Sequence, residues 1–386
     1  MKPIYLDNSA TTRPYPEVIT LMSRVQEENY GNPSSTHAMG MEGEKLLTLA
    51  RKQVNALFRS EAGRVIFTSG GTEANNLALK GAARRLKKRG RKIITSAIEH
   101  SSVLDCCRSL AEEGFELKIL PVDSKGQVDL QSLEKELNRE TVLLSLIHVS
   151  NEIGTVQPLT EAGQLMKKSG APALFHIDAV QSFGKLPLEV DSWGADLVSA
   201  SAHKTHGPKG TGCLWLRNGV MLDALIQGGD QEEKLRPGTE NCPGIAGFGL
   251  AAQIAADRSL GTADKVRRLK EIFLLKLQEE GAAAIVNGPA LEEAAPHILN
   301  LSFPGIKAEV LLNALSGAGI YVSAGSACHS RHPEPSHVLE AIGLERMRLE
   351  SALRFSFSIL NTEEEALRAA ESCAGLIKNL KNFLGS

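Results

Sequence analysis

Residues 65–98 read VIFTSGGTEANNLALKGAARRLKKRGRKIITSAI, and this segment is enough to indicate the fold class. The apolar run at 65–68 predicts a strand, the amphipathic stretch at 72–88 predicts a helix, and residues 92–98 predict a second strand. A strand, a helix and a strand in this order are typical of a crossover between parallel strands of one sheet.

The same alternation runs through most of the chain. Further helices are predicted at 102–113, 130–137 and 160–169. Short apolar runs predict strands at 115–122, 142–149, 173–177, 196–200 and 212–216. Apolar runs of this kind suit strands that are covered on both faces. The pattern therefore predicts an α/β protein with a mainly parallel sheet flanked by helices.

The pattern changes near residue 258. A long amphipathic helix is predicted at 263–280, and sparser strands follow at 297–303, 320–323 and 353–358. A last helix should begin after Thr362, because Thr362 and Glu365 have the spacing of a capping box. We therefore expect a large α/β domain at 13–258 and a smaller α+β domain built from 1–12 and 259–386.

Composition and charge exclude several classes of protein. The 386 residues carry 43 Lys and Arg against 45 Asp and Glu, a net charge of −2, which argues against a nucleic-acid partner. No apolar run approaches the roughly 18 residues of a membrane span, and the N-terminus lacks the apolar core of a signal peptide. The six Cys are scattered and form no CxxC pair, so neither a disulfide framework nor a metal site is expected. We therefore expect a cytoplasmic protein.

Polar residues cluster where the predicted strands end, and open parallel sheets bind ligands there. The segment TSGGTE at 68–73 joins a strand to a helix. Its paired Gly70 and Gly71 let an anion approach the free N–H groups of the helix start, beside Thr72. The alternative is a plain glycine turn in which Thr72 caps the helix.

Other strand ends supply ionisable and amide groups. His100 and Asn151 each follow a strand, and Asp178 ends an apolar strand with Gln181 three residues later. Each has a plainer alternative, because a lone His is more often structural and an Asp in this place can merely cap a helix. Lys204 follows the strand at 196–200, and a lysine at the edge of a dry site can form a Schiff base.

An anion site, an acid and a lysine at neighbouring strand ends are the parts that pyridoxal phosphate requires. This cofactor needs a Lys for covalent attachment and an acid that keeps its pyridine nitrogen protonated. Each motif is weak alone, but together they predict a pyridoxal-phosphate enzyme.

The sequence resembles the cysteine desulfurases, the NifS/IscS-like branch of the class V aminotransferase superfamily, which are pyridoxal-phosphate enzymes of fold type I. The resemblance covers essentially the whole chain. It rests on YLDNSATT (5–12), NPS (32–34), TSGGTE (68–73), EH (99–100), NEIG (151–154), DAVQ (178–181), HK (203–204), GPKG (207–210), RPGT (236–239) and GSAC (325–328).

The resemblance implies a role for each site residue. Lys204 would bind the cofactor and later act as the base at the substrate α-carbon, and Asp178 would pair with the pyridine nitrogen. His100 would stack on the ring and assist proton transfer, while Gln181 and Asn151 would bind near the ring hydroxyl. The phosphate would be held by Gly71, Thr72, Ser201 and His203, with Thr239 from the second subunit of a homodimer.

The resemblance also implies how L-cysteine is bound and used. Arg354 would bind the substrate carboxylate, with Asn32 and Asn151 nearby. Cys328 is the decisive residue, because a thiolate must attack the substrate sulfur. Residues 323–335 predict a mobile loop, in which His329, Arg331 and His332 could lower the thiol pKa. The products would be alanine and a persulfide on Cys328, whose sulfur passes to an acceptor protein such as an iron–sulfur cluster scaffold.

Other cysteines and a basic segment have plainer interpretations. Cys106, Cys107, Cys213 and Cys373 fall inside predicted helices or strands, and only Cys242 stays open. The basic run at 84–92 fits the last turn of a helix better than a nucleic-acid patch, although it could also dock a sulfur acceptor.

Four positions depart from the family pattern: Asp230 replaces a common Gly, Glu233 stands where an Arg usually follows Gln-Glu, Pro237 replaces a common Ser and Ser150 a common Asn. They put in doubt the detail of the phosphate contact between subunits. Two other functions remain open: a related class V aminotransferase or selenocysteine lyase, and a non-catalytic scaffold. Cys328 argues against a plain aminotransferase, which needs no mobile thiol, and Lys204 with Asp178 argues against a scaffold.

Overall fold

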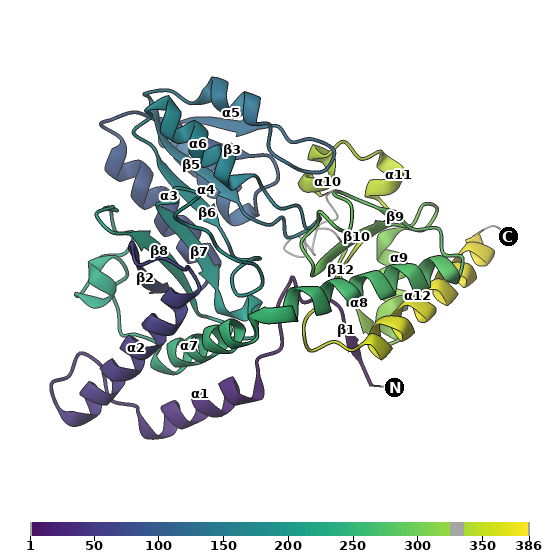
Figure 1. Ribbon diagram of the computed structural model, residues 1–386, viewed down its shortest axis with the longest axis horizontal. Helices are drawn as coiled ribbons and strands as arrows, with labels where there is room; N and C mark the ends of the chain where they lie inside the picture. Colours follow the sequence, from purple (N-terminus) through teal and green to yellow (C-terminus); the bar gives the residue numbers. More distant parts are fainter. Residues whose placement is uncertain (1, 325–335, 385–386) are drawn as a thin grey trace.

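The computed structural model describes residues 2–324 and 336–384, and a seven-stranded sheet forms the centre of its larger part (Figure 1). The strand order is β2 (Gly63–Thr68), β8 (Gly212–Arg217), β7 (Leu197–Ser201), β6 (Leu174–Asp178), β5 (Thr141–Ile147), β3 (Lys92–Ser96) and β4 (Glu116–Leu120). Strands β7, β6, β5, β3 and β4 pair in parallel, which confirms the predicted α/β class with a mainly parallel sheet.

Strand β8 is the exception, because it runs antiparallel to both β7 and β2. Only residues 202–211 join β7 to β8, and their regular structure is a single short 3₁₀ turn, Ala202–Lys204. A parallel pair needs a crossover of a dozen or more residues, so this short connection reverses the chain. The 3₁₀ turn therefore leaves Lys204 at the end of β7.

Helices cover both faces of this sheet (Figure 1). Helices α3 (Gly71–Leu86) and α4 (Ser101–Glu112) pack on one face. The other face is covered by α2 (Ala38–Ala56), α5 (Leu130–Glu136), α6 (Leu159–Ser169) and α7 (Cys242–Asp257), and α1 (Pro16–Glu28) packs on α7. The sequence analysis missed α1, α2 and α7; α7, which is rich in Gly and Ala, is buried along most of its length and so shows no clear polar face.

The remaining elements form a second core. Strands β12 (Ala352–Ser356), β10 (Ile298–Ser302) and β9 (Ile285–Val286) pair antiparallel, and β1 (Ile4–Tyr5) pairs in parallel with β11 (Ile320–Tyr321). Around them lie α8 (Ser259–Glu279), α9 (Ala308–Gly317), α10 (His337–Ala341), α11 (Arg346–Leu349) and α12 (Glu363–Leu384). Phe273, Phe303, Phe355 and Phe357 fill this core. The division into domains at residues 12 and 258 stays a prediction.

Two local predictions are confirmed. The capping box forms at the start of α12, where the Glu365 amide donates to Thr362 Oγ1 over 3.1 Å and the Thr362 amide donates to Glu365 Oε2 over 3.3 Å. The basic run at 84–92 does lie at the end of a helix, since α3 ends at Leu86.

Within the described part of the chain, no helix is both long and apolar enough to cross a membrane.

The N-terminal segment connects the second core to the edge of the large sheet. The amide of Leu6 donates to the carbonyl of Tyr321, and six residues later the amide of Thr12 donates to the carbonyl of His203 over 2.8 Å. The backbone of residues 7–11 therefore crosses the space beside Lys204. This path brings carbonyl groups from the chain start to the predicted site.

Candidate active site

A cavity of about 300 Å³, partly open to solvent, lies at the carboxyl ends of β5, β6 and β7 and at the start of α3. Parallel sheets bind ligands at this edge. The structure brings to this one cavity ten of the predicted residues: Gly71, Thr72, His100, Asn151, Asp178, Gln181, Ser201, His203, Lys204 and Arg354.

Lys204 lies in the wall of this cavity, in the 3₁₀ turn after β7. Its Nζ donates to the carbonyl of Ala10 over 2.8 Å and also to the carbonyl of Ser9. Gln181 Nε2 donates to the same Ser9 carbonyl over 2.9 Å. The sequence analysis listed residues 5–12 as a motif but assigned Ser9 and Ala10 no role. Their backbone carbonyls hold the amine in the cavity.

Asp178 ends β6 and is buried, with 3% of its surface exposed. Its Oδ2 accepts from Asn75 Nδ2 over 2.8 Å, and its Oδ1 accepts from the Val180 amide over 2.9 Å. Asn75 also donates to Ser102 Oγ over 2.9 Å. Asn75 was not predicted, although it lies three residues after Thr72 and therefore on the same face of α3. These bonds fix the carboxylate in one orientation.

His100 is the N-cap residue of α4. Its Nδ1 accepts from the Ser102 amide over 3.1 Å and lies 2.8 Å from Ser102 Oγ. Burial lowers the pKa of His100, and the charge of Asp178 opposes this effect only in part. The ring is therefore neutral near pH 7 and can accept or deliver a proton.

The start of α3 has the features of an anion site. Its N-cap residue is Gly70, so the alternative in which Thr72 caps the helix is wrong. The first residues of the helix, Gly71 and Thr72, line the cavity, and their N–H groups have no partner within the helix. A Cβ on Gly71 would lie 2.7 Å from Val180 Cγ2, so this position requires glycine. Ser201 Oγ is buried without a hydrogen-bond partner among the described residues. Burial lowers the pKa of His203 to about 4.

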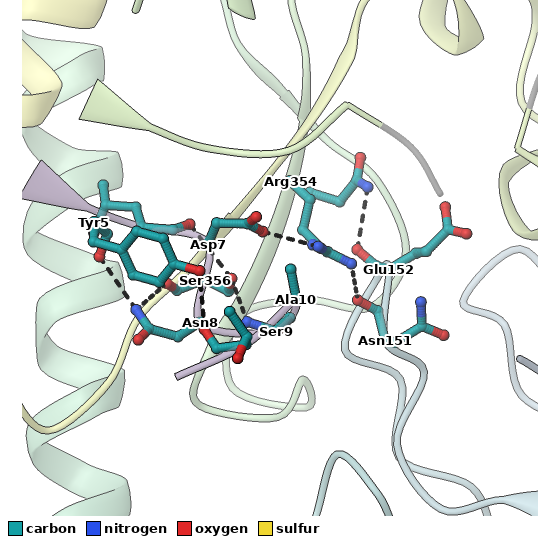
Figure 2. Close-up of polar contacts among 12 residues, drawn as sticks. Tyr5, Asp7, Asn8, Ser9, Ala10, Asn151, Glu152, Arg354 and Ser356 are labelled. Atoms are coloured by element: carbon teal, nitrogen blue, oxygen red, sulfur yellow. Dashed lines mark hydrogen bonds and ion pairs between the residues drawn. The ribbon is translucent and has the colours of Figure 1, made fainter. Parts of the chain in front are cut away.

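Arg354 enters the cavity from β12 and lies between Asp7 of the chain start and Asn151 (Figure 2). Its Nη2 pairs with Asp7 Oδ1 over 2.9 Å, and its Nη1 donates to the Asn151 carbonyl over 2.9 Å. Arg354 is 2% exposed, and its Nε has no partner among the described residues. Burial raises the pKa of Asp7, although Arg354 opposes this. Asp7 is a site residue that the sequence analysis missed.

Two predicted residues that the structure describes, Thr239 and Asn32, do not line this cavity. Thr239 lines a separate cavity with Thr68 and Arg236, and Asn32 is exposed, with its Oδ1 accepting from the Ser34 amide over 2.9 Å. Cys328 lies outside the described residues. The cavity also contains Glu152 and His337, which the sequence analysis did not select.

Glu99 is fully buried beneath this site. Its Oε1 accepts from Ser96 Oγ over 2.6 Å and from the Ile147 amide over 2.9 Å, whereas Oε2 has no partner among the described residues. Burial raises the pKa of Glu99 to about 8. The carboxyl group is therefore protonated at neutral pH.

A raised pKa stabilises the fold at low pH, and that stability is lost as the pH rises through the folded-state value. We expect Glu99→Gln, which mimics the protonated group, to remove this dependence. Between pH 7 and 9 the free energy of unfolding of the wild type should fall by about 1–2 kcal/mol relative to the variant. Denaturant titrations at several pH values measure this difference. Parallel pH profiles would contradict the assignment.

Comparisons with known proteins agree with this geometry. The family model described as aminotransferase class-V matches residues 4–368. The cysteine desulfurase IscS of Methanosarcina thermophila is 41% identical over 385 residues, 99% of this chain and 94% of that protein.

Two solved structures have the same fold. A NifS-like protein superposes with a TM-score of 0.91 at 39% identity, over 98% of this chain and 100% of that one. SspA in complex with cysteine gives a TM-score of 0.81 at 31% identity, over 93% and 100%. The predicted fold type I is thereby confirmed. The family model matches most of the chain, and relatives about 40% identical cover nearly its full length. The chain therefore belongs to the class-V aminotransferase family, among the cysteine desulfurases of the NifS/IscS type.

Proposed function

We propose that this chain is a pyridoxal-phosphate-dependent cysteine desulfurase that converts L-cysteine to L-alanine and leaves the sulfur as a persulfide on Cys328. The observation that carries this proposal is the meeting of Lys204, Asp178 and Arg354 in one cavity. A lysine and an acid suit the cofactor, and a buried guanidinium suits the carboxylate of an amino acid.

The family uses pyridoxal phosphate, and the residues of this cavity fit it. Asp178 would hold the pyridine nitrogen, and Gln181 and Asn151 would lie near the ring hydroxyl. The unpartnered Ser201 hydroxyl, His203, Thr72 and the first amides of α3 would bind the phosphate. When bound, the cofactor draws electrons from the substrate α-carbon and weakens the bonds around it.

The protein groups then divide the work of binding and proton transfer. Arg354 orients the substrate through its carboxylate, and Lys204 Nζ takes the proton from the α-carbon. Neutral His100 delivers or removes protons on the other side of the cavity. Asp178 and Arg354 are both buried, so little water reaches them. The attraction of Asp178 to the pyridine nitrogen and of Arg354 to the substrate carboxylate is therefore stronger than it would be in water.

Cys328 completes the reaction. Its thiolate attacks the sulfur of L-cysteine, a new S–S bond forms, and the carbon–sulfur bond breaks. The electron pair of that bond stays on carbon, which takes up a proton and leaves as alanine. The terminal sulfur of the persulfide is then transferred to an acceptor protein, for which we propose an iron–sulfur cluster scaffold in the cytoplasm.

A homodimer fits the positions of Thr239 and Asn32, which lie outside the cavity of their own chain. Large apolar side chains are exposed on α1, on α2 and between them: Ile19 at 52%, Tyr30 at 70%, Met41 at 55% and Leu49 at 52%. Exposed apolar groups gathered on one region are typical of an interface. We propose that a second copy covers them and that Thr239 reaches the partner's phosphate site.

Replacing Arg354 tests the proposed substrate contact. Arg354→Met should raise the KM for L-cysteine by about 10- to 150-fold. This range corresponds to the loss of one hydrogen bond to a charged group, which contributes about 1.5–3 kcal/mol to binding. Asp7→Asn is the matched control, because it removes the ion pair but leaves the guanidinium. A similar rise of KM in both variants would mean that only the structural ion pair matters.

The experiment that tests the proposed function is a product assay. The purified protein is mixed with L-cysteine and a reductant, and alanine, sulfide and pyruvate are measured together. We expect alanine and sulfide in equal amounts. Formation of pyruvate, or transfer of the amino group, would keep the cofactor but exclude the desulfurase reaction.

A further inference from the structure

A second, smaller cavity of about 50 Å³ lies next to Lys204, at the junction between the two cores. Its wall is formed by the end of α7 and the first turns of α8, by the chain start around Thr12, and by residues 184–185, 204–206, 296–297 and 357–359. Lys204 is the residue that this cavity shares with the candidate active site. No role for this space follows from the proposed function.

Positive charge dominates the described lining of this cavity. Lys185, Lys204 and Arg258 contribute to its wall, whereas none of the described lining residues is Asp or Glu. Cations without a facing acid favour an anionic ligand, since the attraction is strong in a partly dry site.

His297 points to a ligand independently. It is 2% exposed and lines the cavity, yet neither ring nitrogen has a hydrogen-bond partner among the described residues. Burial lowers its pKa well below the ordinary value, and Lys185 lowers it further. The neutral ring keeps one N–H donor, and leaving a buried donor without a partner costs about 1–3 kcal/mol. A ligand oxygen at this place would satisfy it.

Lys185 is also short of acceptors. The one acceptor of its Nζ among the described residues is Gln181 Oε1, at 3.5 Å, the outer limit of a hydrogen bond. An ammonium group has three donors. Burial lowers the pKa of Lys185 to about 7, with further contributions from Lys204 and Arg354. An anion in the cavity would supply the missing acceptors.

Apolar side chains form part of the remaining wall, with Val266, Pro296, Phe357 and Ile359, beside polar residues such as Asn8, Thr12 and Ser358. An inorganic dianion has no apolar part that could pack against these side chains, and it would lose more hydration than a monoanion. A free amino acid would bring an ammonium group next to the basic groups of Lys185 and Arg258. The chemistry that fits is a small carboxylate with a short apolar chain and no amino group.

We propose that this junction cavity is a binding site for a small aliphatic monocarboxylate, held by Lys185 and His297 next to Lys204. Because its wall comes from both cores, an occupied site would tie the two parts of the chain together.

Ligand-detected NMR on the purified protein tests this site, with propionate as the probe. Saturation transfer to the propionate methyl group should be strong, and propionamide, its neutral isostere, should bind much more weakly. Lys185→Met and His297→Phe should each weaken propionate binding by about tenfold or more, as expected when a buried charged or polar contact is lost. Arg354→Met should change the affinity for propionate by no more than about twofold, because Arg354 lines the candidate active site and not this cavity.

Several outcomes would overturn the proposal. Binding that disappears only in Arg354→Met would assign propionate to the candidate active site instead. Equal affinity for propionamide would show that the charge of the ligand is irrelevant. Unchanged binding in Lys185→Met would exclude the site even if His297→Phe does not fold, since methionine replaces the apolar stem of lysine and removes the ammonium group.

Discussion

Replacing Lys204 with alanine is expected to lower the turnover of L-cysteine by about 10³-fold or more. The variant loses the base at the substrate α-carbon, a contribution of about 10²- to 10⁴-fold by itself, and also the covalent attachment of the cofactor. The protein should therefore lose the yellow colour of the attached cofactor as well. Turnover is measured as alanine release, and colour as visible absorption.

Lys209→Ala is the matched control for this variant. Lys209 lies five residues further on, in the same connection between β7 and β8, but it is exposed and does not line the cavity. It should leave colour and turnover unchanged. A Lys204→Ala variant that keeps the activity of the wild type would exclude both the cofactor assignment and the catalytic site, and would favour a non-catalytic scaffold.

Replacing Cys328 with alanine is expected to abolish both products while leaving the yellow colour intact. Alanine and sulfide should fall together, by at least about 10³-fold, since loss of a nucleophile has effects of this size or larger. The persulfide is detected by mass spectrometry as one added sulfur atom on the peptide that contains Cys328. Separating colour from turnover distinguishes this variant from Lys204→Ala.

Cys242→Ala is the control, because Cys242 is the other cysteine that the sequence alone leaves open. In the structure Cys242 begins α7 and is 7% exposed, and its Sγ donates to the Glu240 carbonyl over 3.6 Å. Burial raises the pKa of its thiol, so little thiolate forms. Activity should be retained. If Cys242→Ala loses activity and Cys328→Ala keeps it, the sulfur carrier has been assigned to the wrong residue.

The sequence was sufficient for most of the fold and for selecting most of the residues that meet in the candidate active site. Each strand predicted for the large sheet is present, because an apolar run of this length is a local property. Lys204 and Asp178 could be selected because each follows directly on such a run, and strand ends of a parallel sheet meet at one edge. The reversed β8 could not be predicted, because its direction depends on the short connection before it and on its pairing with β2.

Contacts between distant segments explain what the sequence missed. Asp7 and Arg354 form an ion pair although 347 positions separate them, and Asn75 holds Asp178 across 103 positions. Similarly, the carbonyls of Ser9 and Ala10 reach Lys204 only because the chain start crosses between the two cores. Nothing in the local pattern of residues 7–10 or 75 indicates these partners.

The sequence by itself therefore determined the fold class, the helix cap at Thr362 and the chemical groups present at the strand ends, because periodicity, capping and residue type act over a few positions. Only the tertiary structure decided which groups share a cavity, how Arg354 and Asp178 are held, and that a second, cationic space adjoins Lys204. The physical reason is that burial and pairing of charges depend on segments far apart in the chain, whose approach is set by the packing of the two cores.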